Sequence, residues 1–374
     1  MTARLLEAAD DMEADGCIAG HFAAAFARAS TQAFIANATS RMMLVQSGPH
    51  SLPVTVDDGG YGRSYVASPH SAYVLYARAE MDIVGFVKGR RMANAALGVL
   101  DGMLRMARIN RAVHVDNWLL STNLHGGWEG AGLAGIRRLL AERFPTHFLI
   151  LRSLDEWSSP QLLQAARDDG WMLLPARQIW VVDDLARDWR PRNNFDNDRR
   201  ALTKSGLVVE EARQFDATDR ARIAELYRML YVQKYSPLNP VFTPQFIALT
   251  QTTGLLHYRV ARDATGRIMA VAGMLARGKV MTPPVVGYDI TCPRADALYR
   301  IASFMFSQLA MERGLRLHGS AGAADFKRRR GAHGVIEYMA LHAGHLDVSR
   351  RTAVRLLASQ LERFVVPMMQ KEGW

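Results

Sequence analysis

Short apolar strands alternate with amphipathic helices along the first half of the chain. Helical periodicity over 88–108 and 131–143 alternates with strand-like runs at 147–153 and 178–184. Elements that alternate in this way pack as a sheet covered by helices, which predicts an α/β fold. Residues 1–40 instead have helix-type spacing throughout, so we expect an N-terminal helical segment before the sheet.

A polar stretch, RDWRPRNNFDNDRRALTKSG at 187–206, separates this run from a second one. The second run predicts two strands joined as a hairpin at 264–266, a strand ending in VVGYDI, a helix over 296–313 and two further strands. The end of a helix, a basic turn and a strand with a histidine occur in both halves, which favours two similar units. We expect these divisions: 1–190 as the N-terminal helical segment and first unit, 191–206 as a linker, and 207–374 as the second unit.

The chain is strongly basic. Its 374 residues carry a formal net charge of +10, and 49% of them are hydrophobic, enough to fill two cores. An excess of this sign attracts polyanions and acidic partners, yet the Lys and Arg residues are dispersed, which argues against a dedicated nucleic-acid arm. The composition therefore indicates a globular protein with an acidic substrate or partner.

Cysteine content and the N-terminal sequence bear on location. Cys17 and Cys292 fit no metal-binding spacing and are too few for a disulfide scaffold. The first residues, MTARLLEAADDMEADGC, are acidic where a secretory leader is basic and then apolar, and no run approaches the length of a membrane span. We expect a cytoplasmic protein without a membrane span or a metal.

Two stretches of the second half carry most of the functional information. In VVGYDITCPRADALYR, 285–300, a strand leads directly into a helix. In LRLHGSAGAADFKRRRGAHGVIEYMAL, 315–341, a strand ending in His318 runs into small residues and then into Lys327 and three arginines before another strand. Small side chains let a ligand approach the backbone, and the basic group suits an anion; the alternative is a solvated turn that keeps a sheet edge soluble.

These stretches resemble the GNAT acyltransferase superfamily, and more narrowly its two-domain FemAB-like branch. The likeness covers 205–345 in the order of elements and 40–190 more loosely. It implies two tandem GNAT-like units, each a mixed, mostly antiparallel central sheet flanked by helices. It also implies an N-acyltransferase that moves an acyl group, a fatty acyl group being one candidate, from acyl-CoA or an acyl-phosphopantetheine carrier protein to the amine of a small molecule or peptide. The 18 methionines suit a fatty chain and equally suit ordinary core packing.

The resemblance assigns donor-binding residues around the turn into the helix at 296. Backbone N–H groups and the positive end of that helix would face the donor's phosphates. The usual loop, Gln or Arg followed by x-x-Gly-x-Gly/Ala, is replaced here by Arg294 followed by Ala295, Asp296 and Ala297. This departure favours a carrier-protein thioester or aminoacyl-tRNA over free coenzyme A. The expected donor-binding residues are Thr291, Arg294, Tyr299, Arg300, Ser320 and Lys327.

Proton transfer is assigned to the ends of two strands. In such folds the strand before Asp289 and the strand carrying His318 lie side by side and splay apart, and their ends face one pocket. Attack by an amine on a thioester requires removal of one proton and protonation of the departing thiolate. Asp289 or His318 is the expected base, and Tyr288 the expected acid, with Tyr299 as an alternative.

Polar clusters in the first half are candidates for binding the acceptor. GRSYVASPHSAY contains Tyr65 and His70, and DNWLLSTNLHGGW contains Asn117 and Asn123. Such clusters could line a cleft between the units, although most polar loops have no ligand.

Other functions remain open from the sequence. GAGLAG at 130–135 matches a dinucleotide fingerprint, but STNLHGGWE separates it from the preceding strand, which disfavours a nicotinamide-dependent oxidoreductase. His342 and His345 have no matching partner for a metal site. A FemAB-like transferase using aminoacyl-tRNA and a non-catalytic binding protein stay as alternatives to the acyltransferase.

Overall fold

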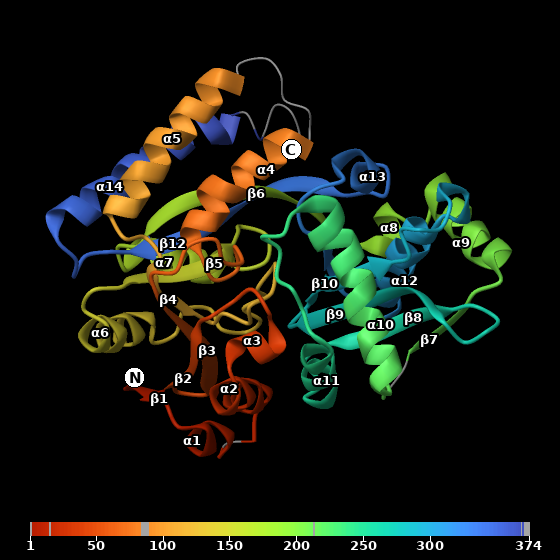
Figure 1. The fold of residues 1–374 in the computed structure, drawn as a ribbon, viewed down its shortest axis with the longest axis horizontal. Coiled ribbons are helices and arrows are strands. Elements are labelled where there is room, and N and C mark those ends of the chain that lie inside the picture. The colour runs from red at the N-terminus through yellow and green to blue at the C-terminus, as the bar shows by residue number, and fades with distance from the viewer. Residues whose placement is uncertain (1, 15, 84–89, 212–213, 368, 370–374) are drawn as a thin grey trace.

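The structure is a computed structural model that describes residues 2–14, 16–83, 90–211, 214–367 and 369. Its described strands form one twelve-stranded sheet in the order β1-β2-β3-β4-β5-β12-β6-β11-β10-β9-β8-β7 (Figure 1). The strands are β1 (Ala3–Leu6), β2 (Arg41–Ser47), β3 (His50–Asp58), β4 (Arg111–Val115), β5 (Phe148–Leu154), β6 (Met172–Val182), β7 (Val208–Glu211), β8 (His257–Arg262), β9 (Ile268–Arg277), β10 (Val280–Tyr288), β11 (Arg316–His318) and β12 (His333–His342).

Helices cover both faces of this sheet. The α-helices are α1 (Ala9–Glu13), α2 (Ile18–Arg28), α3 (Thr31–Phe34), α4 (Tyr76–Ile83), α5 (Arg90–Met106), α6 (Leu133–Arg143), α7 (Pro160–Asp168), α8 (Leu185–Asp188), α9 (Asn193–Ser205), α10 (Ala217–Tyr227), α11 (Pro244–Thr252), α12 (Leu298–Glu312), α13 (Ala324–Arg328) and α14 (Val348–Gln360). Three π-helical turns, η1 (Ser71–Leu75), η2 (Arg228–Tyr235) and η4 (Leu361–Val365), and a 3₁₀ turn, η3 (Arg294–Asp296), complete the described elements.

The sheet is mixed and mostly antiparallel, which confirms the expected fold class. Among the described strands, only the pairs β4–β5 and β10–β11 run parallel. One strand of each parallel pair is preceded by a long helix, α5 before β4 and α12 before β11, and this is the repeated order seen in the sequence. The hairpin β8–β9 turns at Asp263–Gly266, where Gly266 has the positive φ of 82° that this turn requires.

The last strand of the chain enters the middle of the sheet. β12 pairs antiparallel with β5 on one side and with β6 on the other, and β6 in turn pairs with β11. The two halves of the chain therefore share one continuous sheet. The segment expected as a linker, 191–206, consists mostly of α9, which packs against α12.

The N-terminal segment is only partly helical. Residues 1–40 were expected to be helical, but β1 forms an edge strand paired with β2 in the register Ala3↔Ser47 to Leu6↔Leu44. A run of four residues is too short for its helical spacing to be distinguished from a strand. The rest of the segment forms α1, α2 and α3 as expected.

Three apolar clusters hold the helices to the sheet. Phe22 of α2 and Ile136 of α6 pack on one face of the first half, and Leu104 of α5 packs with Leu357 of α14 on the other. Met305 of α12 packs on β9, β10 and β11 in the second half. In Figure 1, α4, α5 and α14 lie over one face of the sheet, and α6 lies with α1–α3 toward the other.

Sequence signals explain where the helices of the second half begin. Asp216 caps α10 by accepting from the backbone N–H of Asp219, and Thr243 caps α11 by accepting from that of Phe246. Gly287 of β10 lets α10 approach closely, because a Cβ there would lie 2.6 Å from the backbone of Leu226 and Tyr227. The end of β10 is therefore fixed directly against α10.

Candidate active site

Strands β10 and β11 pair over only two residues. The pairs are Val280↔Arg316 and Met281↔Leu317, and beyond Met281 the described part of β10 pairs only with β9 up to Tyr288. One edge of β10 is thus left open where β11 ends at His318. Splayed parallel strands of this kind are what the GNAT resemblance predicts.

The splay also separates two residues that were expected together. His318 is level with Thr282, and Tyr288 lies six residues further along β10. At about 3.3 Å per residue this corresponds to about 20 Å. Asp289 and His318 therefore occupy opposite ends of the opening and do not share a pocket.

Asp289 forms a closed polar cluster with its neighbours. Its Oδ2 accepts from Nη2 of Arg222 at 2.5 Å, and its Oδ1 accepts from the N–H and the hydroxyl of Thr291 at 3.0 and 2.6 Å. Burial acts to raise the pKa of this carboxyl, but the bonds from Thr291 and Arg222 leave it below its ordinary value. A groove of 890 Å³ runs alongside, lined by Arg222 and Arg267, but Arg222 also pairs with Glu225.

His318 lies buried at the other end. Its Nδ1 accepts from the backbone N–H of Ser320 at 3.1 Å, so the neutral ring carries its proton on Nε2. That Nε2 has no hydrogen-bond partner and lies 3.8 Å from Oε2 of Glu337 on β12. Burial lowers the pKa of His318, which keeps the ring neutral with its N–H directed at a carboxylate.

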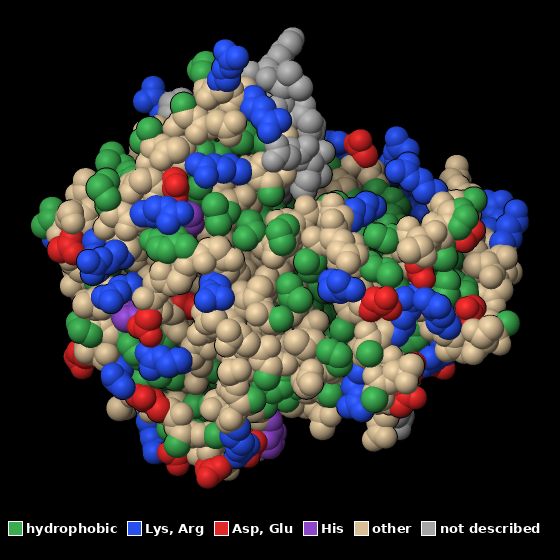
Figure 2. Space-filling model, viewed as in Figure 1, with side chains coloured by type: hydrophobic (Ala, Val, Ile, Leu, Met, Phe, Trp, Pro, Cys, Tyr) green, Lys and Arg blue, Asp and Glu red, His purple; other side chains and the backbone are tan. Residues whose placement is uncertain are grey.

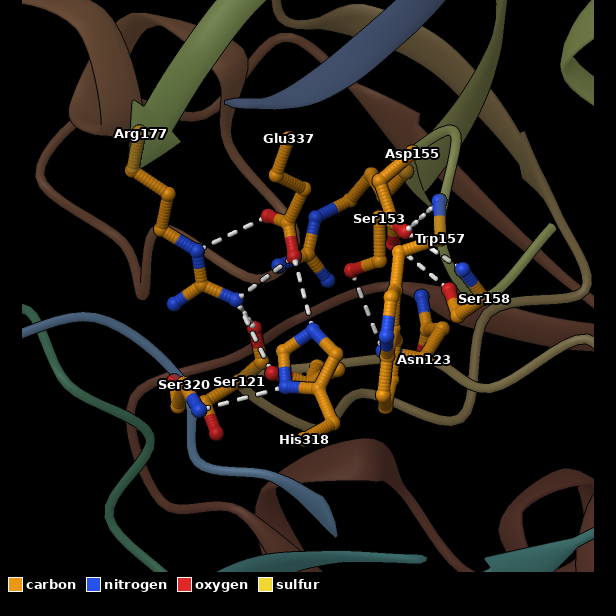
Figure 3. A network of polar contacts seen from close by, with 12 residues as sticks. Ser121, Asn123, Ser153, Asp155, Trp157, Ser158, Arg177, His318, Ser320 and Glu337 are labelled. Atoms are coloured by element: carbon orange, nitrogen blue, oxygen red, sulfur yellow. Dashed lines mark hydrogen bonds and ion pairs between the residues drawn. The ribbon is translucent and has the colours of Figure 1, made fainter. Parts of the chain in front are cut away.

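Glu337 is held by an arginine from the neighbouring strand. Nε and Nη2 of Arg177, on β6, donate to its two oxygens at 2.8 and 3.0 Å (Figure 3). Nη2 of Arg177 also donates to the carbonyl of Ser121 and the hydroxyl of Thr122. Burial acts to raise the pKa of Glu337, yet Arg177 holds it below its ordinary value, so the carboxylate is ionised.

Lys327 approaches this cluster from α13. Its Nζ donates to the carbonyls of Ser320 and Ala321 at 3.1 and 2.8 Å. Burial of the ammonium, with repulsion from Arg177, lowers its pKa to about 7. Gly319 lets this stretch approach β6 closely, because a Cβ there would lie 2.9 Å from the carbonyl oxygen of Trp180. The small residues after His318 thus fold the basic segment back onto the strand end.

Arg152, on β5, is the most buried cation of the cluster, with 6% of its surface exposed. Its Nη1 donates to the carbonyls of Val66 and Leu120 and, at 3.4 Å, to Oδ1 of Asn117. Arg177 and Glu337 are close enough for their charges to act on the pKa of Arg152, which burial lowers to about 10. We refer to Arg152, Arg177, His318, Lys327 and Glu337 as the central cluster.

Tyrosines from both halves surround the central cluster. Tyr65 lies with its ring centroid 5.1 Å from that of Tyr76 and 5.9 Å from the guanidinium carbon of Arg152. Tyr231, on the π-helical turn η2, is half-buried, and burial with the charges of other tyrosines, Tyr65 among them, raises its pKa. Two of the three π-helical turns carry tyrosines to this region, Tyr73 on η1 and Tyr231 on η2, and such turns are frequent at functional sites.

The residues expected to bind the donor divide between the two ends. Ser320 and Lys327 lie at the central cluster, as described. Thr291 donates to Asp289, Arg294 is exposed in η3, and Tyr299 packs between Tyr288 and Phe326 with ring centroids 5.9 and 4.7 Å away. Burial raises the pKa of Tyr299, and the hydroxyl of Tyr288 accepts from Nζ of Lys234 at 3.3 Å.

Arg300 is already paired. Its Nε donates to Oδ1 of Asp198 at 2.8 Å, and Arg330 donates to both oxygens of the same fully buried carboxylate. Asp198 lies on α9, so the segment expected as a linker supplies the counter-charge for two basic residues of the second half. A phosphate at Arg300 would have to compete with this carboxylate.

The residues expected to bind the acceptor lie in different places. Tyr65 borders the central cluster. His70 is buried, and its ring Nε2 lies 2.5 Å from Oδ1 of Asp101 on α5. The backbone N–H of His70 donates to Oδ1 of Asn110. Asn117, which accepts from Arg152, and Asn123 are both buried. The side-chain amide of Asn123 donates to Oδ1 of Asn117 at 3.3 Å, and this bond fixes the loop that follows β4.

The glycines of the dinucleotide-like motif have packing roles. Gly130 has a φ of 95°, and a Cβ there would lie 2.6 Å from the Cβ of Ala165 on α7. Gly132 precedes α6 with a φ of 77°. Asp155 accepts from the backbone N–H groups of Trp157 and Ser158, which closes the turn after β5. These positions are explained without a dinucleotide.

No group of three or more His, Cys, Asp or Glu side chains is arranged to hold a metal ion among the described residues. No described helix combines the length and apolarity required to cross a bilayer. On the face shown in Figure 2, Lys and Arg are spread around the molecule rather than gathered into one patch.

Sequence reasoning missed Arg152, Arg177 and Glu337. Glu337 lies in the otherwise apolar run VIEYMAL and Arg177 in LLPARQIW, and a charged residue within a buried strand is a usable signal. Nothing in the sequence indicates that these strands are neighbours, because β12 joins β6 over a separation of 160 residues between the paired side chains.

Comparison with known proteins gives matches to solved structures only. No family model and no curated protein matches the chain. L-PGS from Bacillus licheniformis is similar with a TM-score of 0.47 and 13% identity over 66% of this chain and 82% of that one. FemX is similar with a TM-score of 0.43 and 11% identity, covering 56% of this chain and 76% of that one.

A tandem GNAT protein from the clavulanic acid biosynthesis pathway spans more of the chain. It covers 91% of this chain and 98% of its own, with a TM-score of 0.39 and 13% identity. GNAT proteins and FemX, the groups that the sequence resembles, are thus among the similar solved structures. The fold class itself rests on the strand order, because TM-scores below 0.5 are too low to carry an argument.

Proposed function

We propose that the protein is a GNAT-type transferase that moves an acyl group from a thioester donor, acyl-CoA or an acyl-carrier protein, to an amine and forms an amide. The observation that carries the proposal is the opening between β10 and β11, which pair over two residues and then separate beside the central cluster. The open edge of β10 offers backbone groups to an extended donor arm, as an added strand would use them. The second unit, 207–374, would bind the donor and the first unit the acceptor.

Glu337 is the proposed proton-transfer group, and His318 is its partner. The amine nitrogen attacks the thioester carbonyl, the carbon–nitrogen bond forms, and the amine proton passes to the Glu337 carboxylate. The carbon–sulfur bond then breaks as Glu337 returns this proton to the departing thiolate. The Nε2–H of the neutral His318, 3.8 Å from Oε2 of Glu337, faces the carboxylate and keeps its proton throughout. Arg177 orients the carboxylate.

Of the residues expected to transfer protons, the proposal keeps His318 at the reacting end, as the partner that faces Glu337. Both oxygens of Asp289 accept hydrogen bonds from Arg222 and Thr291, which favours a structural role. Tyr288 and Tyr299 lie at the same end as Asp289, where they would contact the donor with Thr291 and Arg294. Ser320 and Lys327 would contact the donor near its thioester.

An aminoacyl-tRNA donor is the second candidate. The net charge of +10 suits an acidic donor of either kind, a carrier protein or a tRNA. In that reaction a ribose oxygen replaces the thiolate as the leaving group, and Glu337 would protonate it in the same way.

The test is a donor panel with a mixed pool of amines. Short- and long-chain acyl-CoAs, acyl-carrier proteins and charged tRNA are each incubated with the protein, and released thiol, deacylated tRNA and acylated amine masses are measured. We expect one donor class to give release matched by an amide product, with a rate reduced about 100-fold in His318→Gln. His147→Gln, which alters a histidine paired with Asp58 outside the central cluster, serves as the matched control. Failure of every donor to give product would overturn the proposal and favour a binding protein.

A further inference from the structure

The central cluster contains more positive than negative charge. Arg152 and Arg177 are both permanently charged, and Glu337 is the one carboxylate among the described residues that pairs with either of them. His318 is kept neutral by burial. Glu337 pairs with Arg177, so no carboxylate of the described residues remains for the buried Arg152. Buried charges in folded proteins are normally paired.

Arg152 is the cation left without a carboxylate. Only its Nη1 donates to described residues, and the acceptors are two carbonyls and an amide oxygen, all uncharged. No carboxylate of the described residues lies within the 4.0 Å of an ion pair, although the arginine is 94% buried. A guanidinium has five donors, so Nε and Nη2 remain available for a ligand.

The surroundings of Arg152 admit a ligand. Arg177 keeps 21% of its side-chain surface exposed, and Ser121, Tyr65 and Tyr76 are half-buried, so this end of the cluster is reached from solvent. The ring of Tyr65 lies over Arg152 and covers it from one side. A group bound here would lie next to Glu337 and His318, since both arginines act electrostatically on Glu337.

We propose, resting on the acyltransferase function above, that Arg152 and Arg177 together bind a singly charged oxyanion carried by the acceptor, either a carboxylate or a phosphodiester. One negative charge balances Arg152, the guanidinium without a carboxylate, and two adjacent oxygens suit the fork of a guanidinium. The acceptor is then an amine with an anionic group, held so that its nitrogen reaches the His318–Glu337 pair. Simple alkylamines lack this anchor and are poor acceptors.

The first test measures binding without any donor, so it does not depend on catalysis. Saturation-transfer NMR compares acetate with acetamide, and dimethyl phosphate with trimethyl phosphate, each pair having nearly the same shape with and without charge. We expect one anion to bind, its neutral counterpart not to bind, and affinity to fall about tenfold or more in Arg152→Gln. Arg137→Gln, which alters a half-buried arginine paired with Asp169, should leave binding unchanged.

Each outcome decides the proposal. Selective binding of acetate or of dimethyl phosphate supports it and identifies the anion, whether or not the protein proves to be a transferase. Binding of neither anion, or equal binding by wild type and Arg152→Gln, overturns it even if acyl transfer is found. If Arg152→Gln does not fold, Arg152→Lys replaces it, and an undiminished affinity in that variant also counts against bidentate binding.

Discussion

Each end of the opening beside β10 carries an arginine–carboxylate pair. The two ends differ in how many of the neighbouring hydrogen-bond donors are already bonded. At one end Arg222 and Asp289 form a buried pair whose carboxylate oxygens are both bonded by Arg222 and Thr291. At the other, Arg177 and Glu337 form a buried pair beside a histidine N–H and an arginine that have donors to spare. A completed pair fixes the end of a strand, whereas unsatisfied donors next to a pair leave room for a substrate.

Removing either carboxylate tests how far the two ends are alike. Glu337→Gln leaves Arg177 without its carboxylate, and Asp289→Asn does the same to Arg222. Breaking a buried pair from one side costs about 3–5 kcal/mol, so we expect both variants to lose a similar free energy of unfolding. Urea denaturation followed by circular dichroism measures this loss. A loss below about 1 kcal/mol in either variant would show that its pair contributes little to the fold.

The pH dependence of stability distinguishes the ends further. Burial lowers the pKa of Lys327 to about 7 from its ordinary 10.5, so between these values the unfolded chain holds a proton that the folded chain has released. The free energy of unfolding should therefore rise with pH in this window, by up to about 1.4 kcal/mol per pH unit from this group. Lys327→Met should remove that rise and stabilise the fold at neutral pH. Parallel pH profiles of variant and wild type would refute the buried state of Lys327.

The smallest effects are expected at the basic residues that we propose contact the donor. Arg300 is neutralised by Asp198, whereas no ion pair is found for the exposed Arg294 among the described residues. We expect Arg294→Ala to raise KM for the donor by about fivefold, because a screened surface charge contributes about 1 kcal/mol or less to binding. Arg300→Ala should change it less than twofold. The reverse order would indicate that the donor displaces Arg300 from Asp198.

Much of the fold could be predicted from local signals. Asp216 and Thr243 give the starts of α10 and α11, and the hairpin β8–β9 follows from its turn at 264–266. The helix expected over 88–108 is described from Arg90 and ends at Met106, its first two residues lying outside the described part of the chain. Periodicity fails for β1, where four residues give too little pattern to separate a strand from a helix.

The candidate site could be predicted only in part. His318, Ser320 and Lys327 come from one continuous stretch, and their closeness follows from the sequence alone. Arg152, Arg177 and Glu337 join them only because β12 inserts between β5 and β6, a long-range pairing that no local pattern encodes. Asp289 was expected beside His318, but the register of β10 and β11 puts them at opposite ends of the opening.

The central claim is that the open end of this region, and not the closed one, carries out the chemistry. The most direct measurement is the single-turnover rate of thiol release with the active donor, compared between His318→Gln and Asp289→Asn and normalised to the folded fraction. We predict a loss of about 100-fold in His318→Gln and a rate within about twofold of wild type in Asp289→Asn. A rate that falls in Asp289→Asn but not in His318→Gln would contradict the account.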